Sequence, residues 1–195
     1  MKPEDRMDTS LVDKAIIFAT KAHEGMERRG KGFPYIIHPL EAMAIVASIT
    51  TDQELLAAAA LHDVVEDTEY TVEDIRIEFG DRIASLVHAE SDEKFDNLSA
   101  EESWRRRKEI AIDKLTNASL DVKTVAIGDK LSNLRAISRD YYTVGDEVWN
   151  KFHCKDKSAH EWRYRKLAEA LNELEGTEPH KEMLYLIDCI WGKKQ

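Results

Sequence analysis

Residues 61–68, LHDVVEDT, place one histidine and three carboxylates within six positions: His62, Asp63, Glu66 and Asp67. They directly follow the run LLAAAA, which is typical of the apolar centre of a helix. Burying charge without a partner is costly, so a fold that keeps this cluster at the end of a core helix must compensate it. A bound metal ion is the first candidate.

The spacing of the four residues predicts their arrangement. Positions four apart lie on one face of a helix, so we expect His62 beside Glu66 and Asp63 beside Asp67. An imidazole next to a carboxylate is a mixed nitrogen and oxygen donor set, which suits manganese, iron, nickel or zinc better than calcium. Two adjacent ligands do not fill a coordination sphere, so the remaining ligands must come from elsewhere in the chain.

Two other residues are candidates for the remaining positions. His38 stands in the sequence PYIIHP, and Asp129 interrupts an apolar run in IGDKLSNLR. With His62 and Asp63 they would supply two nitrogens and two oxygens and leave room for water. The two later acids of the octet would then handle protons. This division suits a metal-assisted hydrolase, in which the ion lowers the pKa of bound water and a nearby carboxylate takes the proton.

Four motifs in a fixed order resemble a known family: RRGKGFPYIIHP, AALHDVVEDT, FGDRIASLV and GDKLSNLR. A histidine, then a His-Asp pair, then a distant Asp is the signature of the HD superfamily of metal-dependent phosphohydrolases. More narrowly, the motifs are similar to the hydrolase domain of RelA/SpoT proteins and to the stand-alone small alarmone hydrolases, which include metazoan SpoT homologues. The resemblance spans roughly residues 11–139.

This resemblance implies an all-α HD-domain bundle that removes the 3′-pyrophosphate from (p)ppGpp, a small phosphorylated nucleotide, with Mn²⁺ as cofactor. It also implies a role for each motif residue. The metal ligands would be His38, His62, Asp63 and Asp129. The catalytic pair would be Glu66 and Asp67. Of the substrate-binding residues, Arg28 would contact the guanine base, and Lys94 and Asn133 would line the site of the nucleotide and its phosphates.

The sequence departs from the family on the side that recognises the base. Met26 stands where relatives have glutamine, Ala136 where they often have threonine, and the first motif is one residue longer before PY. An HD phosphohydrolase acting on another nucleotide or on a phosphomonoester, with NADPH and dNTPs included, is therefore an alternative. A non-catalytic nucleotide-sensing module is a third hypothesis, and the retention of Glu66 and Asp67 argues against it.

Each group also has a purely structural interpretation. His62 could cap carbonyl groups at a helix end while the acids are solvated. Asp129 could be a buried acid paired with Lys130 or Arg135, and the segment around Arg28 could be a solvated basic loop.

The elements that must position these residues are predicted to be helices. The 195 residues suit a single HD-type domain over 1–195, with a motif-bearing core at about 11–139 and a helical extension at about 140–195. Periodicity and capping residues predict eight or nine helices, among them 10–25, 39–49, 53–66, 71–80 and 81–89, and no convincing strand. The aromatic residues of the extension could pack across the core or serve a homodimer.

The amino-acid composition limits the kinds of molecule that we expect this chain to bind. The net charge of −10 repels polyanions, which argues against nucleic acid and anionic membranes but not against a small phosphorylated substrate at a metal centre. No apolar stretch is long enough to cross a bilayer, and the N-terminus lacks a signal sequence, so we expect a cytoplasmic protein. Cys154 and Cys189 are too few for a disulfide framework, and we expect both to be reduced.

Overall fold

The computed structural model describes the backbone of residues 7–90 and 100–192, and the side chains of these residues except for 100–103. Ten α-helices and two short 3₁₀-helices make up the regular structure of these ranges, which contain no strand. The prediction of an all-α fold is confirmed. Contacts within the chain define two compact units, residues 1–91 and 92–195, and each is described by itself. The assignment of 1–195 to a single domain stays a prediction.

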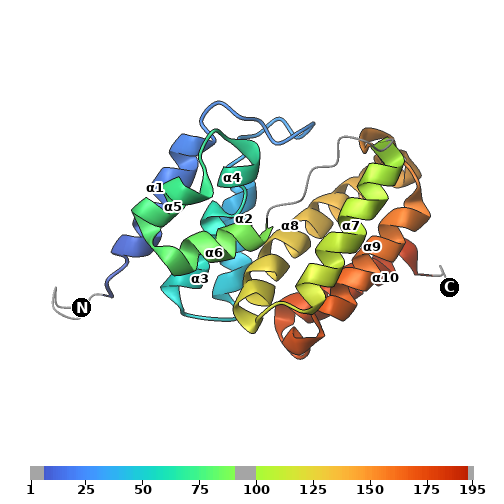
Figure 1. The fold of residues 1–195 in the computed structure, drawn as a ribbon. Coiled ribbons are helices and arrows are strands. Elements are labelled where there is room, and N and C mark those ends of the chain that lie inside the picture. Colours follow the sequence, from blue (N-terminus) through green and yellow to red (C-terminus); the bar gives the residue numbers. More distant parts are fainter. Residues whose placement is uncertain (1–6, 91–99, 193–195) are drawn as a thin grey trace. The chain divides into compact units, whose positions relative to one another are not determined.

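The first unit is built around one helix whose C-terminal half is buried on all sides. Its elements are α1 (Ser10–Ala22), α2 (Ile37–Ala47), α3 (Gln53–Leu61), α4 (Val64–Asp67), α5 (Val72–Phe79) and α6 (Asp81–Glu90). Helix α3 packs against α1, α2 and α6 (Figure 1). Residues 57–61 of α3 have no exposed surface, and four of these five are alanines. The small side chains let the neighbouring helices approach this half of α3 closely, which explains how it can be buried completely.

Capping groups mark the starts of α3 and α5 and the end of α5 where the sequence predicts. The carboxylate of Asp52 accepts a hydrogen bond from the backbone N–H of Glu54 at 3.0 Å at the start of α3. Thr71 and Asp74 form a reciprocal capping box at the start of α5. Gly80 ends α5 with a φ of 88°, a left-handed conformation that a residue with a Cβ adopts only with strain.

The prediction of one continuous helix over 53–66 is wrong. Helix α3 ends at Leu61, and α4 is a separate turn that begins at Val64. In a continuous helix, the carbonyl of Ala59 would accept the N–H four residues later, but here Nδ1 of His62 lies 2.8 Å from that oxygen. A side chain that bonds a carbonyl of its own helix competes with the helical ladder at this point. The break falls at the His-Asp pair itself.

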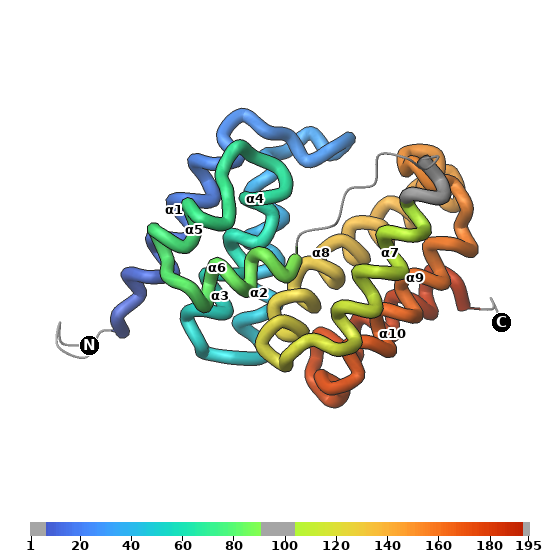
Figure 2. The backbone as a smooth tube through the Cα atoms, viewed as in Figure 1, coloured from blue at the N-terminus to red at the C-terminus, as the bar shows by residue number. Residues whose placement is uncertain are grey.

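The second unit is a set of long helices. It contains α7 (Ala100–Thr116), α8 (Leu120–Val144), η2 (Gly145–Lys151), α9 (Lys157–Ala170), η3 (Asn172–Leu174) and α10 (Glu178–Trp191). Helix α8 packs on α10 and η2, and α9 packs on α7 and α10, as the yellow-green to red part of the tube in Figure 2 shows. Arg135 on α8 donates two hydrogen bonds, of 2.7 and 2.6 Å, to the carboxylate of Glu182 on α10.

The aromatic residues of the C-terminal extension pack together inside this unit. Trp149, which is 3% exposed, stacks on His160 at 5.0 Å and on Trp191 at 5.6 Å between ring centroids. Trp149 therefore packs in the core of this unit, while a role of the extension in a homodimer stays a prediction. Tyr142, at 94% exposed, does not join this cluster.

Two further features bear on the environment of the chain. In the ranges 7–90 and 100–192, no helix combines the length and the apolar character needed to cross a membrane. Cys154 is buried, Cys189 is exposed, and both are free thiols.

Candidate metal centre

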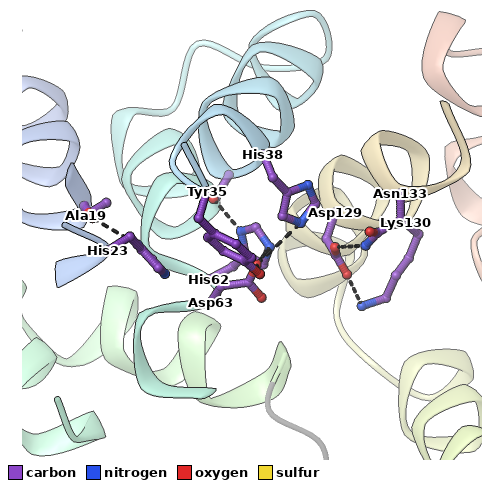
Figure 3. A network of polar contacts seen from close by, with 10 residues as sticks. Ala19, His23, Tyr35, His38, His62, Asp63, Asp129, Lys130 and Asn133 are labelled. Carbon is purple, nitrogen blue, oxygen red and sulfur yellow. Dashed lines mark hydrogen bonds and ion pairs between the residues drawn. The ribbon is translucent and has the colours of Figure 1, made fainter. Parts of the chain in front are cut away.

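Three of the predicted metal ligands converge within the first unit. His38 comes from the first turn of α2, while His62 and Asp63 form the junction between α3 and α4. Oδ2 of Asp63 lies 3.0 Å from Nε2 of His62 and 3.4 Å from Nε2 of His38 (Figure 3). The two imidazole rings are nearly perpendicular, with centroids 5.1 Å apart, and both are buried. Residues 24 positions apart in the sequence thus present two nitrogens to the same carboxylate oxygen.

The tautomer of His62 suits a metal ligand. A carbonyl oxygen can only accept a hydrogen bond, so the 2.8 Å contact with Ala59 places the proton of the neutral ring on Nδ1. Nε2 then carries a lone pair directed toward Oδ2 of Asp63. Two electron-rich atoms at 3.0 Å are mutually repulsive unless a proton or a cation lies near both. The donor set therefore fits the divalent metal ion that the HD signature implies.

The predicted catalytic acids follow immediately on the single turn α4. Glu66 and Asp67 are both exposed to solvent, in contrast to the two buried histidines. The backbone N–H of Asp67 donates to the carbonyl of Asp63 at 2.9 Å, so the four-residue relation between these two acids survives the break in the helix. The predicted ligands and the predicted proton-handling groups thus occupy environments of different polarity.

Tyr35 contacts this centre, although the sequence analysis assigned it no role. Its hydroxyl donates a hydrogen bond of 2.7 Å to Oδ2 of Asp63. Burial, followed by the nearby carboxylates of Asp63 and Asp67, raises the pKa of Tyr35 far above its usual value. The phenol therefore keeps its proton and acts as a donor. The signal that could have identified it is its position three residues before His38, within the motif PYIIHP.

The segment that connects α1 to α2 brings Arg28 to the same tyrosine. The backbone N–H of Tyr35 donates to Met26 at 2.8 Å, and that of Arg28 donates to Phe33 at 2.9 Å, so the segment folds back on itself. The guanidinium carbon of Arg28 lies 5.2 Å from the centre of the Tyr35 ring, whereas Arg29 is exposed. The structure thus distinguishes the two arginines, and the description of a solvated basic loop fits Arg29 better than Arg28.

Two of the remaining predicted residues, Asp129 and Asn133, belong to the second unit. In the second unit, Asp129 on α8 contacts Nζ of Lys130 at 2.6 Å and accepts a hydrogen bond from the amide of Asn133. The pairing with Lys130 considered in the sequence analysis is present, while Arg135 binds Glu182 instead. Lys94 lies outside the described residues. The metal-binding role of Asp129 and the substrate-binding roles of Asn133 and Lys94 stay predictions.

Comparison with known proteins identifies the family. A model of the HD domain matches residues 15–156, which is most of the chain. The chain belongs to the HD domain family.

Several relatives are more specific. The chain is 31% identical over 172 residues to human guanosine-3′,5′-bis(diphosphate) 3′-pyrophosphohydrolase MESH1, with 87% of each chain covered. It is 36% identical over 135 residues to the Xenopus tropicalis MESH1, which covers 68% of this chain and 72% of the relative. The bifunctional (p)ppGpp synthase/hydrolase SpoT of Escherichia coli is 35% identical over 141 residues, or 69% of this chain. The chain spans 17% to 19% of the length of such bacterial relatives.

Solved structures agree on the fold. A metazoan orthologue of SpoT, reported to hydrolyse ppGpp, matches with a TM-score of 0.73 at 25% identity, covering 94% of this chain and 96% of the other. A protein from Listeria monocytogenes matches with a TM-score of 0.70 at 30% identity, covering 80% of this chain and 99% of the other.

Proposed function

We propose that this chain is a divalent-metal-dependent phosphohydrolase that releases pyrophosphate from the 3′ position of (p)ppGpp. The observation that carries the proposal is the convergence of His38, His62 and Asp63 in the first unit of an HD-family chain. The match to the human and Xenopus relatives covers most of the length of those proteins, and their names support the choice of substrate.

The metal would be held by His38, His62 and Asp63, and we add Asp129 as a fourth ligand on sequence grounds, because it holds the place of the distant aspartate in the HD signature. When bound, a divalent ion lowers the pKa of a water molecule and neutralises charge on a phosphoryl oxygen. Mn²⁺ is the ion that we propose, since the set mixes imidazole with carboxylate and resembles that of the alarmone hydrolases.

The exposed acids of α4 would handle the proton. Glu66 and Asp67 lie on the turn that follows the ligand pair, so either carboxylate could accept a proton from the attacking water and orient it toward phosphorus. On the substrate side, we propose that the planar guanidinium of Arg28 contacts the guanine base. Lys94 and Asn133 would bind the nucleotide and its phosphates.

A second candidate function is hydrolysis of another nucleotide or of a phosphomonoester. Met26 and Ala136 favour it, because they replace polar residues that the alarmone hydrolases have at these positions. The backbone carbonyl of Met26 accepts a hydrogen bond from Tyr35, so the altered position lies in the segment that carries Arg28. The metal chemistry would be the same in both functions, and only the bound nucleotide would differ.

A substrate panel tests the proposal. Purified chain with Mn²⁺ is incubated with ppGpp, pppGpp, GTP, NADPH and dNTPs, and the released pyrophosphate and orthophosphate are measured separately. We expect pyrophosphate from ppGpp and pppGpp only. Orthophosphate from NADPH, or turnover of dNTPs in place of ppGpp, would establish the second candidate instead. Binding of ppGpp without turnover would indicate a sensing module.

We also propose that the protein acts in the cytoplasm and leave its association into homodimers as a prediction. The two free thiols, of which Cys189 is exposed, suit a reducing compartment. Analytical ultracentrifugation of the purified chain would measure its oligomeric state.

A further inference from the structure

Tyr35 is tied by its backbone and by its side chain to two of the proposed metal ligands. Its carbonyl accepts a hydrogen bond of 2.9 Å from the backbone N–H of His38. Its hydroxyl donates a hydrogen bond of 2.7 Å to Oδ2 of Asp63. The same residue therefore connects the start of α2 with the junction that follows α3.

The ring of Tyr35 is itself held in place by two neighbours. His23 stacks on it with ring centroids 5.0 Å apart and an angle of 22° between the planes. Nδ1 of His23 lies 2.9 Å from the carbonyl of Ala19, which anchors the histidine to the end of α1 (Figure 3). Arg28 adds its guanidinium at 5.2 Å from the ring centroid. With these contacts, the hydroxyl has little freedom to leave Asp63.

Asp63 is the ligand that most needs such support. Both histidines are buried, and His62 is further fixed by its hydrogen bond to Ala59. The Asp63 carboxylate is partly exposed and lies between two helices rather than inside one. A carboxylate oxygen has two lone pairs, so Oδ2 can accept the hydrogen bond from the phenol and still bind a cation. Hydrogen bonds of this kind orient ligands and tune the affinity of metal sites.

We propose that Tyr35 is a positioning residue of the metal centre: its hydroxyl holds the Asp63 carboxylate in the orientation that binds the ion, and His23 fixes the tyrosine ring by stacking. This inference rests on the proposed function in one respect, which is that Asp63 binds the metal. Tyr35 itself touches neither the substrate nor the ion in this role.

The test is Mn²⁺ binding by isothermal titration calorimetry to the metal-free full chain and to Tyr35→Phe, which removes only the hydroxyl. We expect the Kd for Mn²⁺ to rise by about 10- to 100-fold. The melting temperature of the metal-free chain should stay the same. Turnover of Tyr35→Phe should recover when Mn²⁺ is raised above the weakened Kd. The matched control is Tyr70→Phe, in the same unit and 40% exposed, for which we expect no change in Kd.

The outcomes separate this inference from the proposed function. If the unaltered chain binds Mn²⁺ and Tyr35→Phe binds it equally well, the positioning role is wrong while the proposed hydrolase stands. If the unaltered chain retains no divalent ion, the proposed function is wrong as well. If the melting temperature of metal-free Tyr35→Phe falls in step with the affinity, the hydroxyl serves the fold, and the positioning role is again wrong.

Discussion

At the scale of single residues, the candidate centre separates buried nitrogen donors from exposed acids. His38 and His62 are 4% and 2% exposed, and Glu66 and Asp67 face solvent. A ligand must be fixed in space and protected from competing water, whereas a proton acceptor must reach water. The residue types and their burial thus agree with the two roles that the sequence predicts for them.

Substitutions should separate these roles. His62→Ala removes a proposed ligand, so we expect loss of both bound metal and turnover. Glu66→Ala should retain the metal and lose turnover by about 10²-fold or more, the scale of general acid–base catalysis. Metal content by mass spectrometry and kcat from pyrophosphate release check the two expectations. The control is Glu69→Ala, an exposed acid three residues further on, which should change neither quantity. Full activity of Glu66→Ala would contradict its assignment.

The sequence could identify the candidate ligands but not the residues that support them. His38, His62 and Asp63 stand in sequence motifs that can be recognised without a structure. The contact of Tyr35 with Asp63 joins residues 28 positions apart and depends on how the segment before α2 folds back, which no periodic pattern encodes. The end of α3 at Leu61 could not be predicted for a related reason. Helix propensity does not account for a histidine side chain that forms a hydrogen bond with a carbonyl of its own helix.

At the scale of elements, the helices of the second unit enclose a histidine in an aromatic cluster. His160 on α9 is 1% exposed and lies within 5.3 Å, between ring centroids, of Trp104, Trp149 and Phe152. Its Nε2 lies 2.8 Å from the carbonyl of Cys154 and must donate to it. Nδ1 is buried, and no described residue forms a hydrogen bond with it. A second proton on this ring would therefore be buried without an acceptor.

This cluster predicts a pH dependence of stability. Burial lowers the pKa of His160 below its usual value of 6.5; the hydrogen bond with the carbonyl of Cys154 opposes this shift, the charge of Arg163 adds to it, and the charge of Asp156 opposes it. The unfolded chain then binds a proton that the folded chain does not. The free energy of unfolding is therefore unaffected by His160 well above pH 6.5 and falls as the pH drops below that value toward the folded pKa, by at most about 1.4 kcal/mol per pH unit.

Urea unfolding between pH 8 and pH 5 measures this effect. His160→Gln should flatten the decline below pH 6.5 relative to the unaltered chain, although it lowers stability at pH 8. The exposed His153→Gln serves as the control and should leave the slope unchanged. An equal slope in the His160 variant would show that other groups cause the decline. The sequence alone does not distinguish the two histidines, because packing against three aromatic side chains is a tertiary property.

At the scale of the whole molecule, the net charge of −10 limits the range of partners. Long-range repulsion disfavours polyanions, but a small anion can bind where a cation and basic residues outweigh the surrounding field. We therefore expect a Kd weaker than about 10⁻⁴ M for a fluorescently labelled 30-nucleotide DNA or RNA at 0.15 M salt. Fluorescence anisotropy at 0.05 and 0.15 M salt checks this. Micromolar binding at the higher salt concentration would contradict it.

The buried alanines of α3 limit which positions of this chain tolerate amino-acid substitution. Any larger side chain at residues 57–60 would meet the neighbouring helices and displace the helix end that carries His62. The segment before Tyr35 is largely exposed and carries Arg28 and Met26. A deep mutational scan that measures folding should therefore find residues 57–60 of α3 intolerant and the exposed positions of this segment permissive. Such a scaffold would let selection change the accepted nucleotide repeatedly while the proposed reaction on its phosphate stays the same.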